Sequence, residues 1–318
     1  MLCPLLFVVS SVLLASSASA PPPPPQRWVS YWYSPANITH NALTLALLKK
    51  EGGTKVATSL QLYCGDSIGE DGTFKAGVSP GCDMLIPKLN AMGIGAERIV
   101  GAKDITSLRA MWTHHETDSI AAMVALAKQH KLRGMSWDVE PSGSNKADAV
   151  AYAGYLGKLR QALKPLNARL TTYNNMYDPV ISDFQDIQHG VDRLLDGDTY
   201  NYHTKTGHTA QQNFSSWLSH YHDTVVNANI SRDKAGVSML ASTERGDWNC
   251  ESTTMAQRMK QLKADRVPEL AIFILRSDEA NECPGPLSHS SKLNPDGEPM
   301  CPCSNKWFPF ARDFLAGK

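Results

Sequence analysis

Two carboxylates separated by one residue, Asp138 and Glu140, close the short apolar run 134–139, and Pro141 follows them directly. Side chains alternate between the faces of a β-strand, so these two acids point the same way with Cα atoms about 6.6 Å apart. When two carboxyls share a pocket, each raises the pKa of the other, which keeps a proton available near neutral pH. The pair therefore has the chemistry of a general acid and a neighbour that tunes it. A solvated Asp and Glu at the start of a loop is the alternative interpretation.

The chain around these acids alternates short β-rich runs with helical patterns. Expected strands cover 27–33, 55–63, 98–102, 134–139, 169–173, 193–202, 235–241 and 270–275, and expected helices cover 41–50, 84–92, 119–130, 147–163, 179–189, 214–226, 253–264 and 307–315. Eight strand–helix units predict an α/β fold, a single (β/α)₈ barrel (TIM barrel) over 27–318. An open doubly wound sheet is the alternative, but no glycine-rich phosphate loop follows the first strand. In the barrel, both acids end the fourth strand on the face where such barrels carry out their chemistry.

Other polar and aromatic residues are expected at the same end of the barrel. Ser136 shares the strand face of the two acids, whereas Trp137 should point outward and pack against helices. The sixth strand ends in a polar and aromatic cluster, where a purely structural strand would be aliphatic. The candidates for substrate contact at these strand ends are Ser136, Tyr200, Asn201, Tyr202, Tyr31 and Trp32.

Neither a metal nor a cofactor is expected. The cluster 114–116, His-His-Glu, precedes a helix without a third ligand in register, so we interpret it as a solvated loop. His220 and His222 lie two apart on an expected helix and face different directions. No Gly-x-Ser-x-Gly turn supports a serine nucleophile.

The geometry of the acid pair limits the mechanism. Ordinary glycosidases place two carboxyls on opposite faces of the sugar, whereas two acids leaving one strand approach from the same side. One acid must then protonate, and the nucleophile must come from elsewhere, for example from an N-acetyl group of the substrate.

The strand-four run resembles the Asp-x-x-Asp-x-Asp-x-Glu signature of the family 18 glycoside hydrolases, the chitinases and endo-β-N-acetylglucosaminidases. The segment 198–203 is similar to their Met-x-Tyr-Asp motif. The resemblance implies that Glu140 protonates the glycosidic oxygen and that Asp138 orients the N-acetyl group. It implies further that Tyr200 donates a hydrogen bond to the acetamido oxygen and that the partner is an N-acetylhexosamine oligomer.

Several positions depart from the family pattern. Arg133 and Ser136 stand where the family has its first two aspartates, and Asn201 stands where the second motif has one. The segment 98–102 lacks the family's Ser-x-Gly-Gly, and Phe273 lies near the end of the eighth strand, where a tryptophan is expected. These departures favour one alternative, a chitinase-like lectin without catalysis, although retention of Glu140 opposes it. A family 25-like muramidase, whose barrel also ends a strand in Asp-x-Glu, is a further alternative.

Composition and targeting signals indicate a secreted glycoprotein. The 318 residues carry a net charge of zero, which argues against nucleic acid or an anionic membrane as the main partner. Residues 1–20 are interpreted as a signal peptide, cut after Ala20 or Ala18, and 21–26 as a proline-rich spacer. No other segment is long and apolar enough to span a membrane. Three sequons begin at Asn37, Asn213 and Asn229.

Removal of the leader leaves six cysteines, an even number that indicates disulfides in an oxidising compartment. Cys64 with Cys82 is the favoured local pair. The remaining four, Cys250, Cys283, Cys301 and Cys303, would then staple the late loops, among them the cysteine-rich segment 277–305 that we expect over the barrel mouth. A zinc site formed by Cys283, His289, Cys301 and Cys303 is the alternative.

Overall fold

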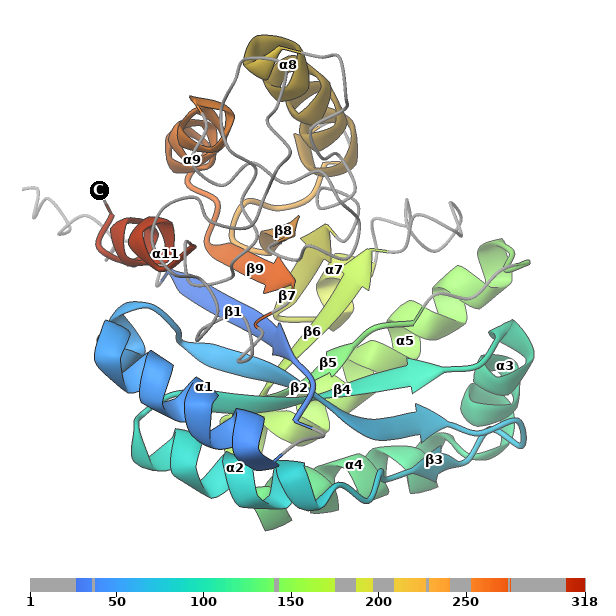
Figure 1. Ribbon diagram of the computed structural model, residues 1–318. Coiled ribbons are helices and arrows are strands. Elements are labelled where there is room, and N and C mark those ends of the chain that lie inside the picture. The colour runs from blue at the N-terminus through green and yellow to red at the C-terminus, as the bar shows by residue number, and fades with distance from the viewer. Residues whose placement is uncertain are drawn as a thin grey trace, which may run out of the picture.

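Eight parallel strands close into a barrel (Figure 1), as the sequence predicts. This computed structural model describes residues 27–35, 38–139, 143–174, 187–196, 209–226, 229–240, 253–273, 275 and 307–317. Closure is complete because β1 pairs in parallel with both β2 and β9. The strands are β1 (Trp28–Tyr33), β2 (Ser59–Ile68), β4 (Gly95–Ala102), β5 (Gly134–Trp137), β6 (Arg169–Asn174), β7 (Arg193–Asp196), β8 (Ala235–Leu240) and β9 (Glu269–Phe273).

Helices surround the barrel, with α1, α2 and α4 below it, α8 and α9 above it and α11 at its left in the view of Figure 1. The helices are α1 (Ile38–Glu51), α2 (Pro80–Ala91), α3 (Ile105–His114), α4 (Glu116–His130), α5 (Lys146–Leu163), α7 (Ile187–Gly190), α8 (Ala210–Tyr221), α9 (Thr253–Ala264) and α11 (Trp307–Leu315). Shorter turns are η1 (Gly53–Lys55), η2 (Lys164–Leu166) and the π-helical η4 (His222–Val226). The barrel and these helices share one core, built from the outward faces of the strands.

The second strand is longer than expected and begins later. Residues 53–55 form the turn η1, so the expected strand over 55–63 is wrong at its start. At its other end β2 runs on past the barrel and pairs in antiparallel fashion with a short strand, β3 (Phe74–Lys75). The disulfide Cys64–Cys82 joins this extension to the start of α2 and confirms the favoured cysteine pair. The remaining five cysteines lie outside the described residues.

A buried ion pair fixes the same extension. Arg98 of β4 donates from Nε and Nη2 to both carboxylate oxygens of Asp66, at 2.6 and 2.7 Å. Both side chains are almost fully buried, and the backbone N–H of Gly77 also donates to Asp66. Burial raises the pKa of the Asp66 carboxyl, and the charge of Arg98 opposes that rise. The pair thereby ties β2, β4 and the segment after β3 together.

One helix was not expected. Asp104 accepts a hydrogen bond from the backbone N–H of Ser107 at 2.8 Å and so caps α3, which places a helix where a connection was predicted. The interpretation of 114–116 as a solvated loop is wrong, because His114 ends α3 and Glu116 begins α4. Glu116 accepts hydrogen bonds from Lys158 of α5.

Some expectations fall outside the described residues. They concern the leader and spacer (1–26), the loop 277–305, most of the helix expected over 179–189 and the end of the strand expected over 193–202. Within the described part of the chain, no helix combines the length and apolar character needed to cross a membrane.

Candidate active site

Asp138 lies at the carboxyl end of β5, at the mouth of the barrel. We use the word mouth for the carboxyl ends of the eight strands. The backbone N–H of Asp138 donates to the carbonyl of Val100 at 3.0 Å, so the ladder between β4 and β5 continues to this residue. Its side chain is half-buried. This is the position that chemistry occupies in (β/α)₈ barrels.

The direction of the β5 side chains follows from Trp137. Trp137 is fully buried and meets the rings of Tyr152 and Tyr155 on α5, with centroids 6.2 and 5.6 Å apart. It therefore points out of the barrel, as predicted. Because side chains alternate along a strand, the two neighbours of Trp137 point the other way. Ser136 and Asp138 are therefore both directed into the barrel. Burial raises the pKa of the Tyr152 phenol, and the nearby charge of Asp138 raises it further.

Three aromatic side chains form one group at the mouth, which we call the aromatic rim: Trp32 of β1, Tyr63 of β2 and Phe273 of β9. The Trp32 ring lies 4.7 Å from Phe273 and is stacked at 6.0 Å on Tyr63. Tyr63 is 51% exposed and Trp32 is half-buried, so the group retains an open face.

Tyr31 does not belong to the aromatic rim. It is fully buried and packs against Phe308 of α11 at 5.8 Å, on the outer side of the barrel. Adjacent residues of one strand face opposite sides, so Tyr31 and Trp32 cannot both reach the mouth. Burial raises the pKa of the Tyr31 phenol well above its ordinary value.

The barrel interior beneath the mouth is lined by polar side chains. Ser136 of β5 and Thr171 of β6 are Cα partners, both fully buried. Within the described residues, Ser136 Oγ, Thr171 Oγ1 and Gln61 Nε2 have no hydrogen-bond partner. Gln61 Oε1 accepts a hydrogen bond from the hydroxyl of Tyr173. Buried polar groups are nearly always paired, so these atoms indicate where water or a polar ligand atom would bind.

An ionic cluster fills the opposite end of the interior. Arg169 donates to Glu269 at 2.6 and 2.7 Å and to Glu97 at 2.8 Å. Its guanidinium lies 4.0 Å from the Trp28 ring, and both glutamates are fully buried. Burial raises the pKa of Glu97, and the charge of Arg169 lowers it. Groups at the amino ends of barrel strands serve stability rather than chemistry. Sequence reasoning missed this cluster, although glutamates within otherwise apolar strands were a signal.

The other predicted site residues lie outside the described residues: Glu140, Tyr200, Asn201 and Tyr202. What the structure brings to the mouth is Asp138, with Ser136 below it and the aromatic rim at the same end. No cluster of three or more His, Cys, Asp or Glu able to hold a metal occurs in the part of the chain that is described.

The fold is shared with solved structures of chitinases. The chain matches the C-terminal domain of a proposed chitinase from Desulfitobacterium hafniense at 11% identity and a TM-score of 0.65, covering 91% of this chain and 99% of that one. It matches a chitinase from Chromobacterium violaceum at 13% identity and a TM-score of 0.60, covering 78% of this chain and 94% of that one. It also matches catalytic domain 2 of an Ostrinia furnacalis group II chitinase at 10% identity and a TM-score of 0.59, covering 92% and 97%.

These likenesses are confined to structure. A variant of the Ostrinia domain was solved in complex with an N-acetylchitooligosaccharide. No protein-family model matches this chain, and no curated protein matches its sequence. The resemblance to family 18 noted in the sequence is thus confirmed at the level of the fold.

Proposed function

We propose that the chain is a divergent family 18 glycoside hydrolase that cleaves N-acetylhexosamine-containing glycans, such as chitin or N-glycans, with retention of configuration. One observation carries the proposal: an inward-directed carboxylate, Asp138, ends β5 at the same end of the barrel as the aromatic rim. Sugars present apolar C–H faces to aromatic rings and polar groups to carboxylates, so this combination suits a glycan.

In the proposed mechanism, Glu140 donates its proton to the glycosidic oxygen as the bond to the anomeric carbon breaks. The carbonyl oxygen of the substrate's own N-acetyl group attacks that carbon and forms a cyclic oxazolinium ion. Asp138 orients the acetamido group and stabilises its positive charge, and Tyr200 donates a hydrogen bond to the acetamido oxygen. Water then opens the ring while Glu140 takes up the proton, which returns the acid to its starting state.

The remaining candidates would bind the sugar or support the acids. Trp32 and its neighbours in the aromatic rim would stack on a sugar ring, and Asn201 and Tyr202 would contact its polar groups. Ser136 is fully buried, so we assign it to the support of Asp138 from below rather than to direct contact with the sugar.

A second candidate function is glycan binding without catalysis. The neutral hydroxyl of Ser136, where the family has a carboxylate, favours it. Arg133, which also stands where the family has an aspartate, does not favour the lectin. It directly precedes β5 and lies about 16 Å along an extended strand from Asp138, so the arginine at this position does not alter the mouth. Retention of Glu140 supports the enzyme.

The test is hydrolysis of chromogenic N-acetylglucosamine oligomers by the wild type and by Glu140→Gln. A matched control is Glu70→Gln, because Glu70 is 75% exposed on the turn that follows β2. Turnover that is abolished by Glu140→Gln and kept by Glu70→Gln supports the hydrolase. Saturable binding of the oligomer without turnover by the wild type would instead establish the lectin. Equal turnover of oligomers that lack the acetamido group would refute substrate assistance.

We also propose that residues 1–20 direct secretion. The Cys64–Cys82 disulfide suits an oxidising compartment, and Asn229, which begins a sequon, is exposed in a turn. On expression in a eukaryotic secretory host, the protein should be recovered from the culture medium. N-terminal sequencing should then show that its first residue is 19 or 21. Retention of the intact leader in the cell would refute this assignment.

A further inference from the structure

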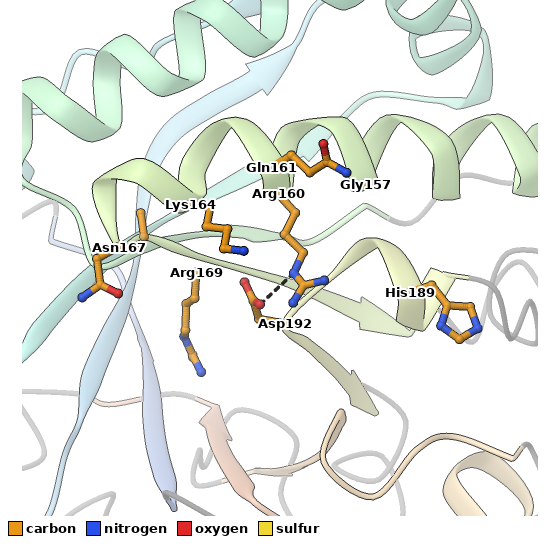
Figure 2. Close-up of a pocket in the computed structure, with 9 residues that line it drawn as sticks. Gly157, Arg160, Gln161, Lys164, Asn167, Arg169, His189 and Asp192 are labelled. Carbon is orange, nitrogen blue, oxygen red and sulfur yellow. Dashed lines mark hydrogen bonds and ion pairs between the residues drawn. The ribbon is translucent and has the colours of Figure 1, made fainter.

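A cavity of about 610 Å³ opens at the amino end of the barrel, far from Asp138. It lies between the end of α5, the start of β6 and the turn that leads from α7 into β7 (Figure 2). Asn167, two residues before β6, and Asp192, directly before β7, line it, whereas Asp138 follows β5. The cavity is therefore separate from the candidate active site, and its volume falls in the range of small-molecule sites.

Both oxygens of the carboxylate in this cavity already accept a hydrogen bond. Asp192 Oδ1 accepts a hydrogen bond from Arg160 Nε at 2.8 Å, the contact drawn as a dashed line in Figure 2. Asp192 Oδ2 accepts from the backbone N–H of Leu170 at 2.9 Å. Because Arg160 is held through Nε, its two terminal nitrogens keep their donors. Neither has another partner within the described residues, so the guanidinium is oriented and still able to bind.

The other polar groups of the wall are donors as well. Lys164, Gln161, Asn167 and His189 line the same space (Figure 2), and their side chains have no hydrogen-bond partner in the described part of the chain. The ammonium of Lys164 can only donate, and the amide and imidazole groups can each present an N–H. The wall therefore offers two cations, Arg160 and Lys164, and several neutral hydrogen-bond donors. Its one carboxylate, Asp192, already accepts hydrogen bonds from the protein.

Neighbouring groups add positive charge near this wall. Lys234 donates from Nζ to the carbonyl of Val191, directly before Asp192. Burial lowers the pKa of Lys234, the charge of Arg160 lowers it further, and the charges of Asp192 and Asp233 oppose that shift. Arg169 also lines the cavity, but its charge is matched inside the barrel by Glu97 and Glu269.

We propose that this cavity binds a small oxyanion, a phosphate or sulfate group, between Lys164 and the terminal nitrogens of Arg160. A guanidinium presents two parallel N–H groups to two oxygens of such an anion, and an ammonium adds a point charge. The amides of Gln161 and Asn167 then donate to the remaining oxygens or to the group that carries the anion. The site is independent of the hydrolase proposed above, because it uses none of its residues.

The experiment is calorimetric titration of the full-length chain at constant ionic strength. The probes are inorganic phosphate, inorganic sulfate, N-acetylglucosamine 6-sulfate and, as the neutral arm, N-acetylglucosamine. The variants are Lys164→Gln, which keeps a hydrogen-bonding side chain without the charge, and Arg160→Lys, which keeps the charge without the fork. Lys88→Gln is the matched control, because Lys88 is exposed on α2, away from the cavity.

We expect one saturable site for an anionic probe, weakened about fivefold or more by Lys164→Gln and by Arg160→Lys and unchanged by Lys88→Gln. Binding of the free ions alone would identify the ligand as a free oxyanion, whereas preference for the sulfated sugar would identify a sugar-borne group. Thermal unfolding of each variant shows that loss of binding is not loss of folding. Absence of saturable binding by any anionic probe, or equal loss in Lys88→Gln, would overturn the proposal.

Discussion

Arg169→Met should be among the most destabilising single substitutions in the barrel. Arg169 pairs with both Glu97 and Glu269, whose side chains are fully buried, and Arg193 lies 3.6 Å from Glu269 alone. Methionine fills a similar volume and can still lie against Trp28, which the guanidinium now covers at 4.0 Å. The substitution therefore removes charge and hydrogen bonds more than packing, and it leaves two carboxylates facing one another in the interior.

The expected loss follows from the burial of the partners. Removing one member of a buried pair costs about 3–5 kcal/mol, because the remaining charge has lost its compensation. In Arg169→Met, Glu269 keeps Arg193 at 3.6 Å, whereas Glu97 keeps no cation among the described residues. We therefore expect a loss of about 3–5 kcal/mol in the free energy of unfolding near pH 8. Lys158→Met is the matched control: Lys158 pairs with Glu116 at 2.7 Å but is 61% exposed. An exposed pair of this kind contributes about 1 kcal/mol or less.

The loss should depend on pH in a defined direction. Burial raises the pKa of Glu97 in the folded chain, and Arg169 holds that rise in check. Without Arg169 the pKa rises further above its value in the unfolded chain. A group whose pKa is higher when folded binds protons preferentially in the folded state, so stability increases as the pH falls through the folded pKa. The deficit of Arg169→Met relative to the wild type should therefore shrink between pH 8 and pH 5.

Urea-induced unfolding of the wild type, Arg169→Met and Lys158→Met at pH 8 and pH 5 measures both effects. Two outcomes would contradict the reasoning. One is a loss in Arg169→Met no larger than that in Lys158→Met, and the other is a deficit that is the same at the two pH values.

Three further perturbations test other parts of the molecule. Cys82→Ala opens a disulfide that joins residues 18 apart, so denaturant unfolding should show a loss of about 3 kcal/mol, matched by the reduced wild type. Trp137→Ala should cost about 3–5 kcal/mol in the same assay, because the indole is fully buried against α5. Asp138→Asn should lower kcat for chromogenic N-acetylglucosamine oligomers by about two powers of ten with an unchanged Tm, and an unaffected kcat would remove Asp138 from the mechanism.

The barrel was predictable from sequence because its signals are local. Alternating strand and helix patterns recur along the chain, and the outward position of Trp137 follows from strand alternation. The Cys64–Cys82 pair was also within reach, since the two residues flank a single connection. The start of β2 was not, because whether 55–58 continues a turn or begins a strand depends on partners in other strands.

The error at Tyr31 has a simple cause. Neighbouring residues on a strand face opposite sides, so assigning Tyr31 and Trp32 to one site conflicted with the alternation that correctly oriented Trp137. The ionic cluster was missed for a different reason. Arg169 lies 72 residues from Glu97 and 100 from Glu269, so only closure of the barrel brings them together. The helix α3 was missed although Asp104 and Ser107 form a capping pattern.

The arrangement of charge inside the barrel bears on how Asp138 would work. The glutamates at the amino end are compensated by Arg169, and the layer between them and the mouth contributes hydroxyl and amide groups from Ser136, Thr171 and Gln61. A neutral residue at 136 places no second carboxylate beneath Asp138 on its own strand. In the proposed mechanism, Glu140 supplies the second carboxyl of the site. In that mechanism the pH response of the reaction at this mouth should reflect these two acids, which approach the sugar from the same side, because the interior beneath them contributes neutral groups.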